Sequence, residues 1–168
     1  MTKGKSRAAP QDPKVTNLDS FDTRILAILQ AEGDLTQSEL SERVNLSPTQ
    51  CGRRVSRLRA EGYIERFAAI LDHRKLGLNV VAHTLVSLRT HEDSTNAAFC
   101  EFISNAREVV ECYAQTGDAD YIVKIICRDL GELSQFLDRM IKASGGLASL
   151  RSSIALKEIK KGHTFPLF

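Results

Sequence analysis

Residues 36–62 read TQSELSERVNLSPTQCGRRVSRLRAEG, and this stretch decides the fold of the first half of the chain. It opens with a T-x-x-E capping box at Thr36, in which side chains at each end of the box bond to the other's backbone N–H. A second box, S-P-x-Q, follows at Ser47 and places proline at the first helical position, where no N–H donor is needed. Gly62 is suited to ending the second helix. The stretch therefore predicts a short helix, a tight connection, and a second helix over residues 48–61.

The second of these helices carries a basic face. Gln50, Arg53, Arg54 and Arg57 lie at positions i, i+3, i+4 and i+7, so they share one side of the helix. Arg59 adds a fourth arginine, and no acidic residue lies between them. Neighbouring like charges cost a few tenths of a kcal/mol per pair, a cost that DNA phosphates would offset through counterion release. The pattern favours DNA binding over a merely solvated helix face, because a helix-turn-helix places its second helix in the major groove.

The position of each polar residue on this helix suggests its role. Free N–H groups and the helix dipole favour a phosphate at the helix start. An arginine can donate a two-pronged contact to guanine, and phosphate contacts from other residues fix the position of the helix on the duplex. The predicted DNA-binding residues are Ser47 and Thr49 at the helix start, Gln50, Arg53 and Arg54 at base edges, and Arg57 and Arg59 at phosphates.

Outward from this stretch, the first third of the chain reads as a winged helix-turn-helix over residues 17–66. Residues 1–16 are polar and mildly basic, which predicts a flexible arm. Asp19 is a candidate N-cap for a helix over residues 20–31 with apolar residues at helical spacing. After the second helix of the motif, an extended segment and a turn predict a strand hairpin, with residues 67–79 acting as hairpin or linker.

In the second half of the chain, residues 80–160 have the pattern of predicted strands and helices of an α+β domain. Alternating apolar residues predict a strand near residues 80–88, a helix capped by Ser94 or Thr95 follows, and residues 109–116 and 121–127 alternate again. Asp129 caps a second helix, and a fourth strand covers residues 150–156. The order β-α-β-β-α-β is typical of the ferredoxin-like fold. Residues 161–168 form a C-terminal tail.

Two motifs in this order resemble a known family. The run Leu46–Cys51, followed by Arg54-Val55, Leu58 and Gly62–Ile64, resembles the DNA-binding module of the Lrp/AsnC family of transcription regulators. Residues 117–121 (GDADY) resemble the G-D-x-D-Y turn of the ligand-responsive domain of that family. Arg59 departs from the family pattern, in which an acidic residue often follows Leu58, so no base preference is transferred from the family.

The resemblance implies a homodimer formed through the C-terminal sheets, with assembly to tetramers or octamers. It also implies an amino acid or related metabolite bound near the turn, where one of two acids would receive the α-ammonium group. The alternative is a simple hairpin turn, in which Asp is a common turn former. The implied effector-binding residues are Thr116, Gly117, Asp118, Asp120 and Tyr121.

Composition excludes several other classes of protein. The chain has 168 residues, a net charge of +2 and 42% hydrophobic residues, which is ordinary for a globular protein and too short for a large multi-domain enzyme. No apolar run approaches the roughly 20 residues that span a bilayer. The four cysteines have no metal-ligand or disulfide spacing, so we expect no metal, no cofactor and a cytoplasmic, nucleoid-associated protein. A redox-sensing role for Cys51 would need an exposed thiol of low pKa.

These patterns together predict a sequence-specific DNA-binding transcriptional regulator whose oligomeric state or DNA affinity responds to an amino acid or related metabolite. Its partners would be double-stranded promoter DNA at pseudo-palindromic sites, a small-molecule effector and further copies of itself, without a membrane. One alternative is an architectural DNA-binding protein that senses no ligand. Another is a small enzyme on the ferredoxin-like half, which is disfavoured because that half has no convincing nucleophile–base pair. We therefore expect no enzymatic activity.

Overall fold

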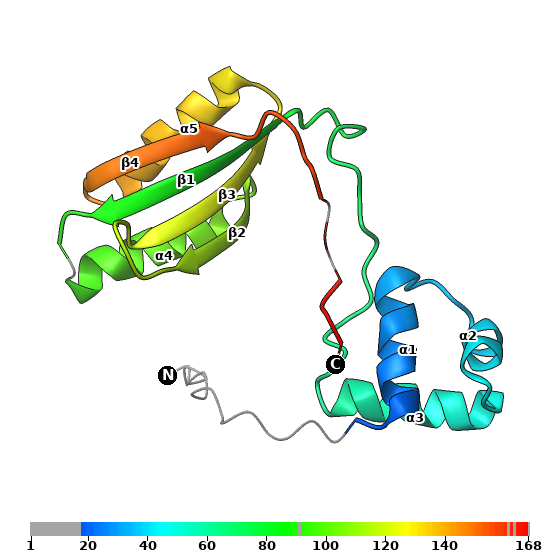
Figure 1. The fold of residues 1–168 in the computed structure, drawn as a ribbon. Coiled ribbons are helices and arrows are strands. Elements are labelled where there is room, and N and C mark those ends of the chain that lie inside the picture. The colour runs from blue at the N-terminus through cyan, green and yellow to red at the C-terminus, as the bar shows by residue number, and fades with distance from the viewer. Residues whose placement is uncertain (1–17, 91, 161, 163, 168) are drawn as a thin grey trace, which may run out of the picture. The chain divides into compact units, whose positions relative to one another are not determined.

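The computed structural model describes residues 18–90, 92–160, 162 and 164–167, and the chain divides into two compact units (Figure 1). One unit combines residues up to Ile70 with Gly162–Phe168, and the other spans Leu71–Lys161. The arm predicted for residues 1–16 lies outside the described residues. Among the helices of the described part, none is long and apolar enough to cross a membrane.

The first unit contains three helices: α1 (Ser20–Ala31), α2 (Gln37–Val44) and α3 (Pro48–Ala60). All three predicted N-caps are confirmed, because Asp19, Thr36 and Ser47 each form a complete capping box. In each box the side chain of the cap accepts a hydrogen bond from an N–H that has no partner within the helix. Local sequence therefore sets where each of these helices begins.

One face of each helix packs into a small apolar core. Ile25, Val44, Cys51 and Leu58 are fully buried, and Leu40 is nearly so. These residues recur at the three- and four-residue spacings that put apolar side chains on one side of a helix. Full burial of a large aliphatic side chain stabilises the fold by about 1.5–3 kcal/mol. The core thus fixes which face of α3 remains exposed.

The segment that follows α3 corrects one prediction. The helix ends as expected, with the Tyr63 N–H donating to the Leu58 carbonyl at 2.9 Å. The expected strand hairpin is absent, because residues 61–79 contain no strand. The chain instead makes a turn in which the N–H of Leu78 donates to the carbonyl of His73 at 2.9 Å and the Asp72 carboxylate accepts from the N–H of Arg74 at 3.0 Å. Extended sequence alone does not make a strand without a partner for its backbone hydrogen bonds.

The second unit has the predicted β-α-β-β-α-β order. Its elements are β1 (Val80–Leu88), α4 (Asp93–Asn105), β2 (Val109–Ala114), β3 (Tyr121–Cys127), α5 (Leu130–Ala143) and β4 (Leu147–Ile154). The four strands are antiparallel in the order β2-β3-β1-β4, which confirms the ferredoxin-like prediction. The start of α4 differs from expectation, because Glu92 occupies the cap position and no side chain of Ser94 or Thr95 caps the helix.

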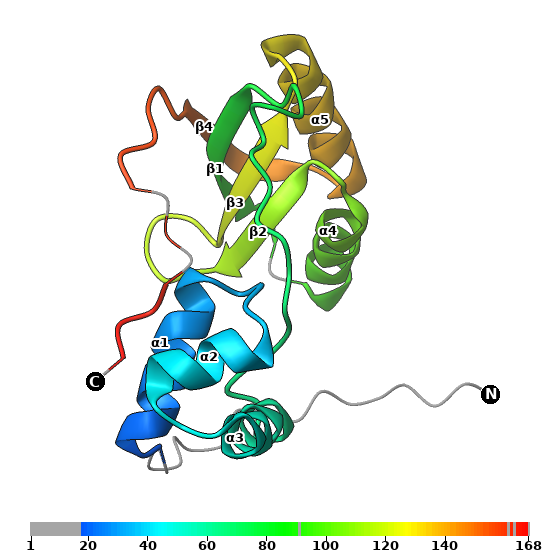
Figure 2. The same cartoon turned by 90° about the vertical axis from the view of Figure 1, so that its right-hand side faces the viewer.

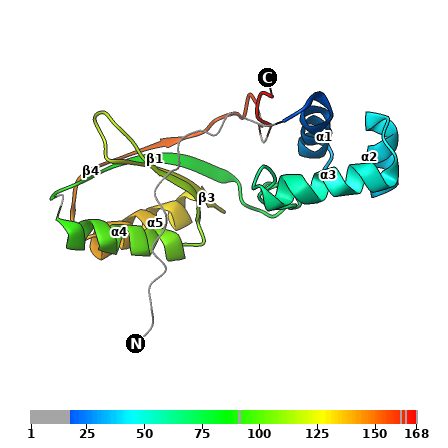
Figure 3. The same ribbon diagram turned by 90° about the horizontal axis from the view of Figure 1, so that it is seen from below.

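The sheet has two unlike faces. Figure 3 shows α4 and α5 on the same side of the sheet, where Ala82, Thr84 and Val86 of β1 are buried. On the opposite face, Leu85 pairs in register with Ile122 of β3, and both side chains are only half-buried. Polar residues share this face, since His83 pairs in register with Lys124 and Leu85 with Arg151. No helix of the second unit covers this mixed face, so it is available for a contact with another molecule.

Candidate DNA-binding surface and effector turn

A tight connection orients α3 against α2 (Figure 2). Asn45 takes the left-handed conformation (φ 56°, ψ 48°), which Asn adopts more readily than most residues. The Leu46 N–H then donates to the Ser41 carbonyl at 3.0 Å, which satisfies one of the orphan carbonyls of α2. Ser47 begins α3 immediately afterwards. Two helices joined by so short a connection form the helix-turn-helix geometry that the sequence predicted.

Helix α3 presents the two faces expected from its residue spacing. Cys51 and Leu58 are buried, whereas Gln50, Arg53 and Arg57 are exposed. The exposed face is continuous along the helix because its residues recur every three or four positions. Packing of the apolar face of α3 in the core thus fixes the orientation of its polar, positively charged face.

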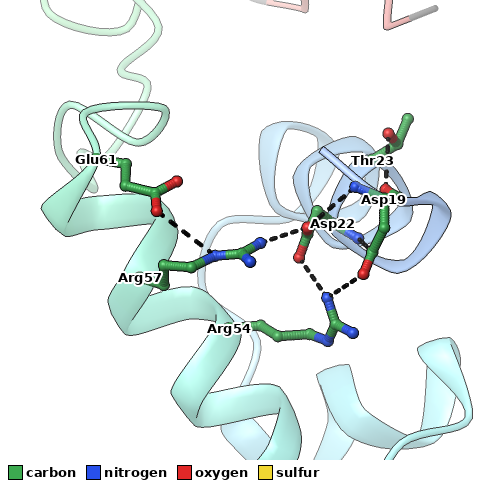
Figure 4. Close-up of polar contacts among 6 residues, drawn as sticks. All are labelled: Asp19, Asp22, Thr23, Arg54, Arg57 and Glu61. Atoms are coloured by element: carbon green, nitrogen blue, oxygen red, sulfur yellow. Dashed lines mark hydrogen bonds and ion pairs between the residues drawn. The ribbon is translucent and has the colours of Figure 1, made fainter. Parts of the chain in front are cut away.

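The basic face has an acidic partner that the sequence analysis missed (Figure 4). Arg54 donates to the Asp19 carboxylate at 2.7 Å and to the Asp22 carboxylate at 2.8 Å. Arg57 also pairs with Asp22, and its Nε lies 3.9 Å from the Glu61 carboxylate. The repulsion among these arginines is therefore offset within the protein, by the carboxylates of Asp19 and Asp22 at the start of α1, and not by DNA phosphates alone.

The carboxylate at the centre of this network is buried. The Asp22 side chain is only 1% exposed, and its second oxygen also accepts from the Asp19 N–H at 3.1 Å. A buried carboxylate is tolerated only when it is paired and hydrogen-bonded. The side chain of Arg54 is 24% exposed, which leaves it less accessible than that of Arg57 at 42%. Arg54 also lies over the ring of Phe21, with its Cζ 5.4 Å from the ring centroid.

The remaining predicted DNA contacts are placed differently. Arg53 is exposed and has no ion pair among the described residues. Arg59 is exposed with its Cζ 5.8 Å from the ring centroid of Phe67. Thr49 is exposed near the start of α3, whereas Gln50 accepts from the Ser47 N–H at 3.2 Å through its side-chain oxygen. Two of the seven predicted contacts, Ser47 and Gln50, therefore also serve as helix caps.

Two further residues of α3 have structural explanations. Gly52 faces the side chain of Gln37 from α2, and a Cβ at this position would lie 2.1 Å from Gln37 Nε2. That amide donates to the Pro48 carbonyl, so it ties α2 to the start of α3. Cys51 is fully buried, and burial raises the pKa of its thiol. Redox sensing needs an exposed thiol of low pKa, so Cys51 does not meet this requirement.

The second candidate site is the turn between β2 and β3. Gly117 has φ +118°, a conformation that favours glycine. Thr116 and Asp118 are exposed, and the side chain of Asp118 has no hydrogen bond or ion pair among the described residues. Asp120 is half-buried and accepts from the Leu88 N–H at 2.8 Å, which ties the turn to the end of β1. The two acids of the turn thus differ: one is exposed to solvent and one supports the backbone.

Tyr121 links the turn to α4. Its hydroxyl donates to the Asn96 side-chain oxygen and lies 3.9 Å from the Cys100 sulfur. Its ring lies 4.6 Å from that of Phe99, centroid to centroid. Burial, followed by the hydrogen bond with Cys100, raises the pKa of the Tyr121 hydroxyl. Asn96 and Cys100 were not predicted at this site, because nothing in the first turns of α4 distinguishes them from ordinary helix residues.

Comparisons with known protein families identify both halves of the chain. Residues 18–65 match the winged helix-turn-helix DNA-binding family, and residues 81–165 match the Lrp/AsnC ligand binding domain. The second match alone covers half of the chain.

Individual relatives are similar along almost the whole chain. The Bkd operon transcriptional regulator of Pseudomonas aeruginosa is 35% identical over 153 residues, which cover 91% of this chain and 100% of the relative. The transcriptional activator DecR of Escherichia coli is 30% identical over 150 residues, which cover 89% and 99%. The structure of a transcriptional regulator from Neisseria meningitidis in complex with L-Met has a TM-score of 0.86 at 36% identity, covering 90% of this chain and 97% of that one.

Proposed function

Because this chain belongs to the Lrp/AsnC family of transcription regulators, we propose that its α3 surface reads operator DNA and that its β2–β3 turn receives an amino acid or related metabolite. The protein is thus a DNA-binding transcriptional regulator with an amino-acid-responsive domain. The observation that carries the DNA-binding proposal is the exposed face of α3, on which Gln50, Arg53 and Arg57 lie beyond a fully buried apolar face.

The arginines of α3 divide into two groups. Arg53 takes the role of base contact, because its guanidinium is exposed and carries no internal ion pair in the described part of the chain. Arg54 is a positioning residue that locks α3 to α1 through two carboxylates. Arg57 holds Asp22 through Nη2 and faces Glu61 with Nε, which leaves the donors of Nη1 for a phosphate. The proposed DNA-contacting set is Ser47, Thr49, Gln50, Arg53, Arg57 and Arg59.

Alanine variants of Arg53, Arg54 and Arg57 test this division. Arg53→Ala should weaken binding to matched operator by about 1–3 kcal/mol and relax base preference, with unchanged stability. Arg57→Ala should reduce the salt slope of binding by about one on any sequence. Arg54→Ala should instead lower the free energy of unfolding by about 1–3 kcal/mol, because hydrogen bonds to charged groups are lost and Asp22 keeps fewer partners.

The measurements are salt-titrated binding to matched and scrambled promoter DNA, with urea unfolding of each variant. Arg43→Ala is a matched control, since Arg43 is a surface arginine of α2 paired with Glu32. Equal DNA affinity of wild type, Arg53→Ala and Arg57→Ala would contradict the proposed reading surface. Unchanged stability of Arg54→Ala would contradict its positioning role.

The effector proposal rests on the exposed Asp118 carboxylate beside the backbone of an open turn. A carboxylate can receive an α-ammonium group, and the N–H groups of a turn can receive a carboxylate. Thr116, Gly117 and Tyr121 complete the proposed site. The N. meningitidis relative crystallised with L-Met makes that amino acid the first probe. Asp118→Asn should weaken amino-acid binding while the fold is retained, whereas Asp120→Asn should also loosen the turn.

Titration calorimetry with L-methionine and a panel of other amino acids decides this point. Unchanged affinity in Asp118→Asn would remove that acid from the site. A ligand that binds without altering operator affinity or oligomer size would favour an architectural DNA-binding protein instead of a responsive regulator. Turnover of the amino acid would contradict the proposal that the protein is not an enzyme.

The regulator acts as a homodimer in this proposal, with the uncovered face of the sheet around Leu85 and Ile122 as the contact. The protomers then present two α3 helices to a pseudo-palindromic site. Higher assembly to tetramers or octamers follows the family pattern. The site of action is the promoter DNA of the cytoplasmic nucleoid.

A further inference from the structure

The chain enters the first unit twice. Residues up to Ile70 build it, the chain then forms the second unit, and Gly162–Phe168 return to the first. All three views show the last described residues beside α1 (Figures 1–3). The two units are therefore joined by two chain segments, one after α3 and one after β4.

A single side chain holds the returning segment by its backbone. The Gln30 amide donates to the Phe165 carbonyl at 3.0 Å and accepts from the Phe165 N–H at 2.9 Å. One side-chain amide thus satisfies both hydrogen-bonding groups of one backbone residue, as a neighbouring strand would. The contact does not depend on the identity of the Phe165 side chain, which is 79% exposed.

An apolar groove lies between the α1 side, the segment after α3 and the returning segment itself. The groove has a volume of about 590 Å³ and is lined by Leu18, Leu26 and Leu29 from the α1 side and by Tyr63 and Phe67 from the segment after α3. Phe165 and Leu167 of the tail also line it; Leu167 is half-buried, whereas Phe165 is exposed. Pro166 favours an extended conformation at Phe165, which suits a peptide laid along a groove. Polar clamping of the backbone and burial of one apolar side chain are typical of peptide-binding sites.

We propose that this groove is a peptide-binding site for the chain's own C-terminal tail, and that the docked tail is a second tether on the DNA-binding unit. A unit held at two points explores fewer orientations than a unit held by residues 61–79 alone. In the homodimer, this restriction raises the effective concentration of the second DNA-binding unit at the second half-site once the first is bound. The inference rests on the proposed dimeric recognition of DNA, and it assigns to the tail a role in binding to the full operator.

Three variants test the tether: a chain that ends at residue 161, Gln30→Ala, and Leu167→Ala. Each should lower affinity for an operator with two half-sites by about tenfold while leaving affinity for one isolated half-site unchanged. Thr164→Ala is the matched control, because Thr164 is an exposed residue of the same segment that does not line the groove, and it should behave as wild type. An unchanged ratio of full-site to half-site affinity in the shortened chain would overturn the tether. Absence of half-site binding in wild type would instead refute the DNA-reading surface.

Binding of the tail in trans tests the groove without DNA. A synthetic peptide of residues 162–168 should bind to the chain that ends at residue 161 and should slow hydrogen exchange of amides in residues 18–30. The same peptide should bind about tenfold more weakly or not at all when Gln30→Ala is introduced, since both clamp bonds are lost. Equal peptide binding with and without Gln30, or no binding to the shortened chain, would overturn the assignment of the groove.

Discussion

Asp22 shows how one buried residue limits what a basic surface can do. Its carboxylate accepts from two arginines of α3 and from the backbone N–H of Asp19, the N-cap of α1, so it is paired and hydrogen-bonded on both oxygens. Such an arrangement adds little net stability over an apolar substitute, but loss of one partner leaves a buried charge without compensation. Arg57 is consequently held in a defined position before any DNA arrives, which lowers the side-chain entropy lost on binding.

Replacing Asp19 with Asn tests the exposed half of this network through its pH dependence. The pKa of Asp19 lies below the ordinary 3.8 because it accepts from the Asp22 N–H and from Arg54. A lowered pKa in the folded state stabilises the fold above the unfolded-state value, and this contribution is lost as the pH falls through the folded-state value. Wild type should therefore be more stable than Asp19→Asn at about pH 6, and the difference should shrink below about pH 4.

Urea unfolding at several pH values measures this difference. Glu65→Gln is a suitable control, because Glu65 is an exposed acid of the same unit outside the network. A gap between wild type and Asp19→Asn that stays constant from neutral to acidic pH would contradict the role of the ionised carboxylate.

Sequence reasoning reached part of the residue-level picture. The exposed and buried faces of α3 followed from spacing within one helix. The partner of those arginines did not, because Asp22 and Arg54 are 32 positions apart and Asp22 reads as an ordinary acid in the first turn of a helix. Contacts between distant positions have no local periodic signal, and they decide which charges remain free.

At the scale of elements, helix starts were the most predictable feature. The boxes at Thr36 and Ser47 act within four residues, so the sequence contains the whole interaction. The hairpin after α3 was wrong for the opposite reason: a strand depends on a partner elsewhere, and residues 61–79 have none in the structure. The start of α4 was also misassigned. Ser94 or Thr95 was predicted as its cap, but Glu92 occupies the cap position and no side chain forms a capping hydrogen bond there.

Gly52 tests how α2 and α3 fit together. Alanine is favoured over glycine by about 1 kcal/mol in a helix, but the added Cβ would displace the Gln37 amide from Pro48. Loss of that hydrogen bond costs about 0.5–1.5 kcal/mol, so Gly52→Ala should leave stability nearly unchanged in wild type. In a Gln37→Ala background the same change should stabilise the unit by about 1 kcal/mol. An identical effect in both backgrounds, measured by urea unfolding, would contradict the steric conflict.

At the scale of the whole molecule, the proposed homodimer uses the uncovered face of the sheet. Leu85→Glu places a carboxylate on this face. Arg151 of β4 is the residue opposite position 85 in the sheet register and can pair with that carboxylate in the protomer. The protomer should therefore stay folded, while the charge would have to be buried in a dimer. We expect sedimentation analysis to show a shift from dimer to monomer, and affinity for a two-half-site operator to fall with it.

Gln135→Glu adds the same charge on the exposed surface of α5, on the other side of the sheet. This control should remain dimeric, and circular dichroism should show native helix content in both variants. A dimer that persists in Leu85→Glu would move the interface away from this face.

The return of the tail to the first unit also has a consequence for biosynthesis. Gln30 emerges from the ribosome 135 residues before Phe165, the residue whose backbone it holds. At translation rates of about 5–20 residues per second, Phe165 is synthesised on the order of ten seconds after Gln30. During that interval the nascent chain exposes an open groove, and a chaperone that recognises apolar surface has its best opportunity to engage this protein.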